Sequence, residues 1–102
     1  MEFSINYSIE IDKHTNINML ISVIIPFFQS STFQIIKLKA INNSITKAVL
    51  VSEVVKSRLL NIHQLLKIGC IDNNTKEIST IVDFLNPFIE IYLSNSSQIE
   101  TY

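Results

Sequence analysis

The sequence predicts a two-layer α+β fold with the element order β-α-β-α-β-β, in which two helices pack on one face of a four-stranded mixed sheet. Three observations lead to this fold class. Four segments alternate apolar and polar residues as strands do, and two segments carry apolar residues at helical spacing. The 102 residues suit a single domain with a modest core, and 47% of them are hydrophobic.

The first strand and the first helix are predicted within residues 3 to 28. Apolar and polar residues alternate from Phe3 to Ile11, which is typical of a strand with one buried face. Thr15 or Asn16 can cap the helix that follows, because a short polar side chain can accept a hydrogen bond from its first amides. The apolar stripe of this helix comprises Leu20, Val23, Ile24, Phe27 and Phe28. A proline inside a helix costs roughly 3 kcal/mol, so we expect the helix to end near Ile25 or to kink there, before Pro26.

A second strand and a second helix are predicted within residues 35 to 59. The strand carries Ile36, Leu38 and Ala40 on one face and Ile35, Lys37 and Lys39 on the other. Asn42 and Asn43 can adopt positive φ in place of glycine, and Asn43 or Ser44 can cap the helix. The apolar face of the helix comprises Ile45, Ala48, Val49, Val55 and Leu59. Val51 and Val54 widen this face, so we expect the helix to pack on the sheet and on a second surface.

The third and fourth strands complete the domain. Leu66, Ile68 and Cys70 share one face of the third strand, so we expect Cys70 to be a small core residue. Residues 78 to 85 fit either a strand extension or a long loop, and Pro87 punctuates the chain before a fourth strand from Phe88 to Leu93. The domain is expected to cover residues 1–94, with residues 95–102 as a loose tail.

Charge, cysteine content and hydropathy exclude several classes of protein. Lys and Arg number 8 against 9 Asp and Glu, so the chain is not a globally basic nucleic-acid binder, although a local basic face is compatible with this balance. A single cysteine rules out an intramolecular disulfide and fits a reducing compartment, so we expect the nucleus or the cytoplasm. The apolar run from Ile17 to Phe28 is shorter than the roughly 20 residues of a membrane span, so no membrane association is expected.

Residues for catalysis or for cofactor binding are missing from the sequence pattern. His14 and His63 do not have the spacing of metal ligands, and Glu53 has no carboxylate or histidine partner near it in the sequence. The chain contains one glycine, which excludes a glycine-rich phosphate loop. We therefore expect no enzyme activity, no metal and no cofactor.

Residues 36 to 59 contain three segments in a recognisable order: Lys39-Ala40, then Ser44-Ile45-Thr46-Lys47-Ala48-Val49, then Glu53-Val54-Val55 with Lys56 and Arg58. This pattern resembles the Alba family of small chromatin and RNA-binding proteins. The family signature is a strand ending in Lys-Ala, a short loop, Ala-Ile-Ser-Lys-Ala-Val, and Glu-Ile-Val followed by two basic residues. The three segments of this sequence match the three parts of the signature in the same order. Leu60 to Gln64 is similar to the eukaryotic branch of the family, and the resemblance extends over roughly residues 7 to 94.

The resemblance implies a homodimer or heterodimer that binds RNA, DNA or both through phosphate contacts. A related eukaryotic branch supplies a heterodimeric pair of subunits to the RNase P and RNase MRP ribonucleoproteins. The residues expected to bind nucleic acid are Lys13, Asn18, Lys39, Asn42, Asn43, Lys47, Lys56 and Arg58. Without the resemblance these would be ordinary solvated lysines and loop asparagines, as we expect Lys37 and Lys67 to be.

Apolar residues of the second helix are candidates for the dimer interface. Leu50, Val51, Val54 and Leu59 offer more apolar surface than one sheet face needs. They fit either a deeper core or a subunit interface. The family dimer forms around this helix, and a wide exposed stripe would be a liability, so we expect the interface.

Departures from the family pattern concern basic residues. The usual Arg-Gly-Arg loop is replaced by Ile41-Asn42-Asn43, and residues 73 to 87 carry only Lys76. The basic pair before the first helix is replaced by Thr15-Asn16. Each missing cation removes a phosphate contact, so we expect this chain alone to bind weakly. Two alternatives stay open: a protein-interaction subunit that pairs with a more basic Alba-type partner, and a structural domain without a nucleic-acid role.

Overall fold

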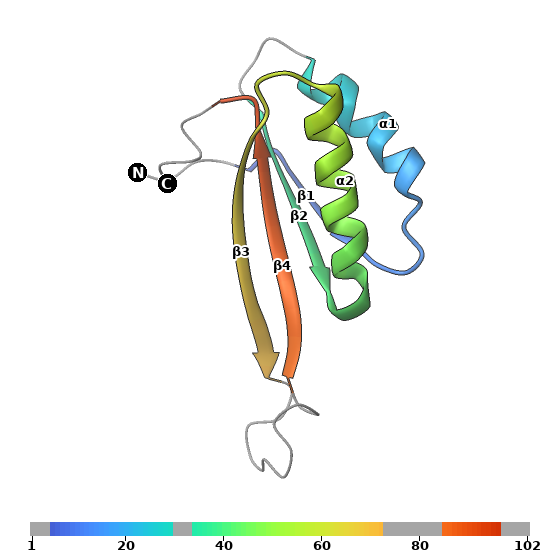
Figure 1. Cartoon of the computed structure of the whole chain (residues 1–102), viewed down its shortest axis with the longest axis vertical. Coiled ribbons are helices and arrows are strands. Elements are labelled where there is room, and N and C mark those ends of the chain that lie inside the picture. Colours follow the sequence, from blue (N-terminus) through green and yellow to red (C-terminus); the bar gives the residue numbers. More distant parts are fainter. Residues whose placement is uncertain (1–4, 30–33, 73–84, 97–102) are drawn as a thin grey trace.

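The computed structural model describes residues 5–29, 34–72 and 85–96 of the chain (Figure 1). The elements follow in the order β1 (Tyr7–Ile11), α1 (Ile17–Phe28), β2 (Ile35–Ile41), the 3₁₀ turn η1 (Asn42–Ser44), α2 (Ile45–Arg58), β3 (His63–Asp72) and β4 (Leu85–Ser94). The predicted order β-α-β-α-β-β is thereby confirmed. The predicted start of β1 at residue 3 and the ambiguous segment 78–84 lie outside the described residues, as does the tail from residue 97.

The four strands form one mixed sheet in the order β1-β2-β4-β3. β1 runs parallel to β2, whereas β4 is antiparallel to both β2 and β3. Both helices lie on the same side of the sheet (Figure 1), as predicted. The other face of the sheet carries no helix in the part of the chain that the structure describes.

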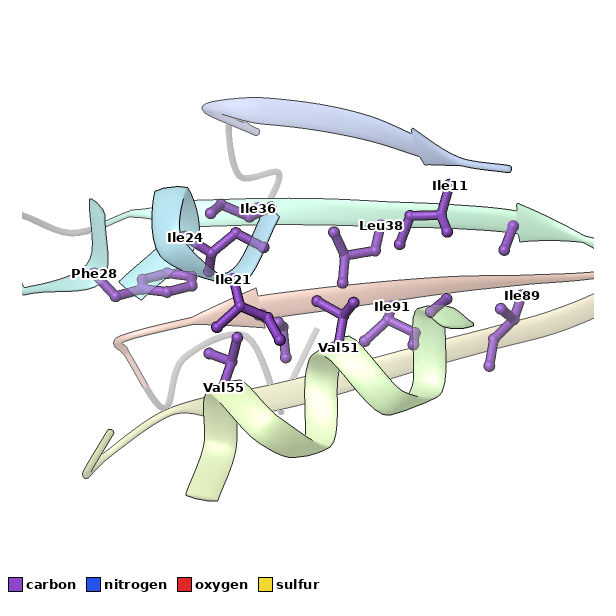
Figure 2. Packing of buried hydrophobic residues seen from close by; sticks show 13 residues of the cluster. Ile11, Ile21, Ile24, Phe28, Ile36, Leu38, Val51, Val55, Ile89 and Ile91 are labelled. Atoms are coloured by element: carbon purple, nitrogen blue, oxygen red, sulfur yellow. The ribbon is translucent and has the colours of Figure 1, made fainter. Parts of the chain in front are cut away.

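The core fills the space between the two helices and the sheet (Figure 2). Ile24 of α1, Leu38 of β2 and Val51 of α2 are each 0% exposed and belong to one cluster. α2 packs against β1, β2, β4 and α1. The second surface predicted for α2 is therefore α1, which explains why its apolar face is wide.

The helix α1 begins at its predicted cap and continues through its proline. The side-chain oxygen of Asn16 accepts a hydrogen bond from the Met19 amide at 3.0 Å. The predicted end near Ile25 is wrong, because the helix runs to Phe28 and the Gln29 amide reaches the carbonyls of Ile25 and Pro26. Pro26 lies in the last turn, so its missing N–H removes only one backbone hydrogen bond, and this loss falls near the end of the helix.

One predicted core position of α1 is exposed. Val23 is 61% exposed, whereas Ile21, which the predicted stripe omitted, is 5% exposed. The buried residues Ile21, Ile24 and Phe28 follow helical spacing. Because α1 contains no charged residue, its sequence does not define which of its apolar sides faces the core.

The prediction that Cys70 is a core residue is wrong. Cys70 is exposed, and its face of β3 also exposes Leu66 at 45% and Ile68 at 74%. These residues lie on the helix side of the sheet, since Leu66 and Ile68 pair with the buried Ile91 and Ile89. β3 is an edge strand that the helices leave uncovered. The apolar residues on its helix side are therefore exposed, although they alternate with polar residues as core residues do.

Pro87 lies inside β4 and does not precede it. The register pairs β2 with β4 only as far as Phe88, opposite Ile41. Beyond this pair β4 has β3 as its one neighbour, with Pro87 opposite Cys70. A proline is tolerated at such a position because one side of the strand needs no amide donor.

Candidate nucleic-acid interface

A tight turn joins β1 to α1 and carries Lys13 at its exposed rim. The Asp12 carboxylate accepts a hydrogen bond from the His14 amide at 2.8 Å, and the Asp12 amide donates to the Thr15 hydroxyl at 2.9 Å. The bond from the His14 amide is the main reason why the pKa of Asp12 lies below its ordinary value. These bonds fix the shape of the turn and leave the Lys13 side chain facing solvent.

The ammonium group of Lys47, in the first turn of α2, is bound to this β1–α1 turn. Its Nζ lies 3.2 Å from the Asp12 carbonyl oxygen, 2.9 Å from that of Lys13 and 3.0 Å from that of Thr15. A lysine ammonium has three N–H donors, so all of them have a protein acceptor. Lys47 was predicted to bind phosphate, but its ammonium group is bound to backbone carbonyls of the protein itself. Its sequence context did not reveal these bonds.

The asparagines after β2 lie exposed in η1. Asn42 has φ 56°, as expected for a residue in place of glycine, whereas Asn43 does not have positive φ. The Asn42 amide group donates a hydrogen bond to the side-chain oxygen of Asn86 at 3.0 Å. Asn86 was not among the predicted residues, because only the strand register brings it beside η1. Ser44 occupies the N-cap position of α2 without a side-chain cap bond.

Lys39 lies near the end of β2, on the helix-free face of the sheet. Its Nζ is 5.9 Å from the centroid of the Phe88 ring, a cation–π distance. The ring of Phe88 lies across Gly69, where a Cβ atom would meet it at 2.8 Å. A hollow of about 150 Å³ is lined by Lys39, Asp12 and other residues from the ends of β1 and β2. Lys39 therefore faces the same end of the molecule as the β1–α1 turn.

The other lysines of the helix-free face are engaged with neighbouring side chains. Lys37 forms an ion pair with Glu90 at 3.3 Å, and Lys67 lies 5.4 Å from the ring centroid of Tyr92. Burial raises the pKa of Glu90, but hydrogen bonds from Tyr92 and Lys37 outweigh it, so the net shift is downward. Burial and the hydrogen bond to Glu90 raise the pKa of Tyr92. Lys37, expected as an ordinary solvated lysine, is partly buried in its ion pair, whereas Lys67 is exposed.

The structure divides the predicted binding residues into two groups. Lys13, Asn18, Lys39, Asn42, Asn43 and Lys47 lie at the end of the molecule where β1 and β2 finish and both helices begin. Lys56 and Arg58 lie in the last turn of α2, at its opposite end. Lys56 pairs with Glu53 at 2.7 Å, and both basic residues suit the negative end of a helix dipole. We call the first group without Lys47 the basic end.

The residues predicted for a dimer interface are also divided. Val51 is 0% exposed and belongs to the core, while Val54 and Leu59 are partly buried against it. Leu50 is 48% exposed. For Val51, the alternative prediction holds: this residue belongs to a deeper core and not to a subunit interface. The exposed apolar residues Leu66 and Ile68 of β3 were not predicted, because they alternate as core residues do.

The described part of the chain offers neither a metal site nor a helix that could cross a membrane. No group of three or more His, Cys, Asp or Glu side chains within residues 5–29, 34–72 and 85–96 could hold a metal ion. Among the described helices, none combines the length and the apolar character that a membrane crossing needs.

The fold and the basic end define a class of small two-layer α+β proteins that present cations and amides at one end of a mixed sheet. The chain belongs to the Alba family, whose family model matches residues 8–71. Its fold is similar to the solved structure of Alba from Thermoplasma volcanium, with a TM-score of 0.64 and 20% sequence identity over 85% of this chain and 98% of that chain. A comparison with curated proteins finds no match. Alba proteins bind nucleic acids, form oligomers and generally have no catalytic activity.

Proposed function

We propose that this protein binds RNA or DNA without catalysis, as an Alba-type dimer that contacts the phosphate backbone through its basic end. The observation that carries the proposal is the grouping of Lys13, Lys39 and the two η1 asparagines at one end of an Alba fold. Lysine neutralises phosphate, and asparagine amides donate hydrogen bonds to phosphate or sugar oxygens.

Electrostatics favours weak binding by one protomer. The chain has a formal net charge of −1, and Asp12 and Glu10 lie close to the cations of the basic end. Each phosphate contact contributes to affinity through counterion release, so a surface with few cations gains little. A dimer doubles the number of these contacts, which is why dimerisation belongs to the proposal.

The uncovered face of β3 supports dimerisation. Leu66 and Ile68 are exposed on the helix side of the sheet, and Val49 on α2 is 40% exposed. Val49 follows Lys47 by two residues, about 200° around the helix, so it lies on the flank away from α1 and towards β3. We propose that a second Alba-type chain covers Leu66, Ile68 and Val49. Leu50 follows Lys47 by three residues and so lies only about 60° from it around the helix, on the flank towards α1 and outside this contact.

The binding test is a salt titration of the purified chain with single-stranded RNA and with duplex DNA. Affinity should fall as salt rises, and the double variant Lys13→Met/Lys39→Met should lower the slope of log K against log[salt] by about 0.7 to 0.9 for each phosphate that it no longer neutralises. Lys67→Met removes one lysine from the middle of β3, and it is the control for each of the single variants Lys13→Met and Lys39→Met. An unchanged slope in the double variant would contradict the assignment of the basic end.

The dimer test compares two single variants by sedimentation. Ile68→Glu places a charge on the uncovered β3 face and should raise the dimer dissociation constant at least tenfold without unfolding the chain. Leu50→Glu tests the interface predicted on α2 and should have the smaller effect. A dimer that tolerates Ile68→Glu places the contact elsewhere.

A second function is favoured by the missing arginines. If a more basic Alba-type partner supplies them, as in the subunit pair of an RNase P/MRP-like ribonucleoprotein, this chain acts mainly as the protein-interaction subunit. The two functions differ in one result. The chain alone would then show no salt-dependent binding even at low salt, while the heterodimer would bind well.

A further inference from the structure

Lys47 is the predicted phosphate ligand whose structural surroundings differ most from the expectation. Lys13 is exposed, whereas Lys47 is partly buried and points into the β1–α1 turn. The three carbonyl oxygens that surround its Nζ at 2.9 to 3.2 Å come from three residues of a four-residue segment. Their dipoles converge on one point, where they would repel one another without a cation.

We propose that Lys47 is a positioning residue: its ammonium group holds the β1–α1 turn against α2 and thereby sets where Lys13 meets a phosphate. The second half of this inference rests on the proposed function, whereas the first half concerns the free protein alone. Lys47 has no donor left for a phosphate while the turn is closed. The residue acts on nucleic acid through Lys13 and not by its own contact.

The bonds within the turn do not replace this clamp. Asp12, His14 and Thr15 are bonded to one another, and Asn16 caps α1, so these bonds define the local shape. In the described part of the chain, the bonds from Lys47 are those that join the turn to α2. Because α2 begins directly after η1, the clamp also fixes the turn relative to Asn42 and Asn43.

The clamp is tested in the free protein by ¹⁵N relaxation. Lys47→Met removes the three donors and keeps most of the aliphatic stem. Backbone order parameters of residues 13 to 15 should fall from a rigid value of about 0.85 towards about 0.6. Lys13→Met, which removes a charge from the same turn, should leave them unchanged. Equal order parameters in wild type and Lys47→Met would overturn the clamp.

The functional consequence is tested by a double-variant cycle on the salt dependence of binding to single-stranded RNA. If Lys47 acts through Lys13, the variant with both residues changed to Met should have the same salt slope as Lys13→Met alone. If Lys47 contacts its own phosphate, the two reductions of about 0.7 each should add, which would overturn the positioning role. Lys67→Met again controls for the loss of one charge.

The two ways of failing are distinguishable. A wild-type chain that shows no salt-dependent binding contradicts the proposed function, whatever the order parameters show. A chain that binds, with a turn that stays rigid in Lys47→Met, contradicts the inference and leaves the proposed function standing.

Discussion

The two edges of the sheet start from the same sequence pattern and end in different environments. β1 and β3 both alternate apolar and polar residues. On β1, Ile11 is 3% exposed because the helices pack over that side, while on β3 Ile68 is 74% exposed. Alternation thus predicts a strand and the residues that share a face. Whether that face is covered depends on where the helices lie.

The largest expected effect comes from truncating the same residue type at both edges. Ile11→Ala should lower the free energy of unfolding by about 2 to 5 kcal/mol, because it leaves a cavity in the core. Ile68→Ala should cost less than about 0.5 kcal/mol in a monomer, since this side chain is mostly in solvent. Urea unfolding at low protein concentration measures both. Similar destabilisation by the two variants would show that the β3 face is covered within the monomer.

A smaller effect is expected at the helix start that follows β1. Asn16→Ala removes the side-chain cap of α1 and should cost about 1 kcal/mol, which weakens the cover of the β1 edge. Ser44→Ala is the matched substitution at the start of α2. Because Ser44 makes no side-chain cap bond, its substitution should cost close to nothing. Equal destabilisation in thermal unfolding would contradict the difference between the two caps.

The smallest expected effect is the response of the β1 edge to acid. The pKa of Asp12 is lowered in the folded protein, chiefly by the His14 amide. A depressed carboxyl pKa stabilises the fold above the unfolded-state value, and this contribution is lost as the pH falls through the folded value. The His14 amide resonance should therefore titrate below the ordinary range of an aspartate. In Asp12→Asn this titration should be absent, while resonances of β3 stay unchanged in both proteins.

Much of the fold could be predicted from the sequence, because its elements have strong local signals. Alternation in β2 and the spacing of Ala48 and Val55 in α2 depend on neighbouring residues only. One wrong prediction, the end of α1 near Ile25, came from a local rule about proline, whereas the wrong burial predictions concern contacts between distant segments. Cys70 and Val23 share a pattern with core residues, and only the position of their elements in the layers exposes them.

The candidate site was predictable as a set of residue types and not as an arrangement. The resemblance of residues 36 to 59 to a family motif indicated Lys39 and Lys47 together. The two lysines differ because the ammonium group of Lys47 is bound to the β1–α1 turn. This turn lies more than 30 residues before Lys47 in the sequence, so the contact could not be predicted from the motif. Asn86 carried no signal at all, since its bond to Asn42 follows from the register of β4.

The strand order has a consequence for how the chain is made. β4 is the last described element, yet it occupies the place between β2 and β3 and brings Ile89, Ile91 and Leu93 to the core. Of the described strands, a nascent chain that ends before Leu85 offers no neighbour to β3 and one neighbour, β1, to β2. Contacts between segments so far apart form slowly. The sheet therefore closes only after the ribosome has released β4, and until then helices α1 and α2 have half a sheet to pack on.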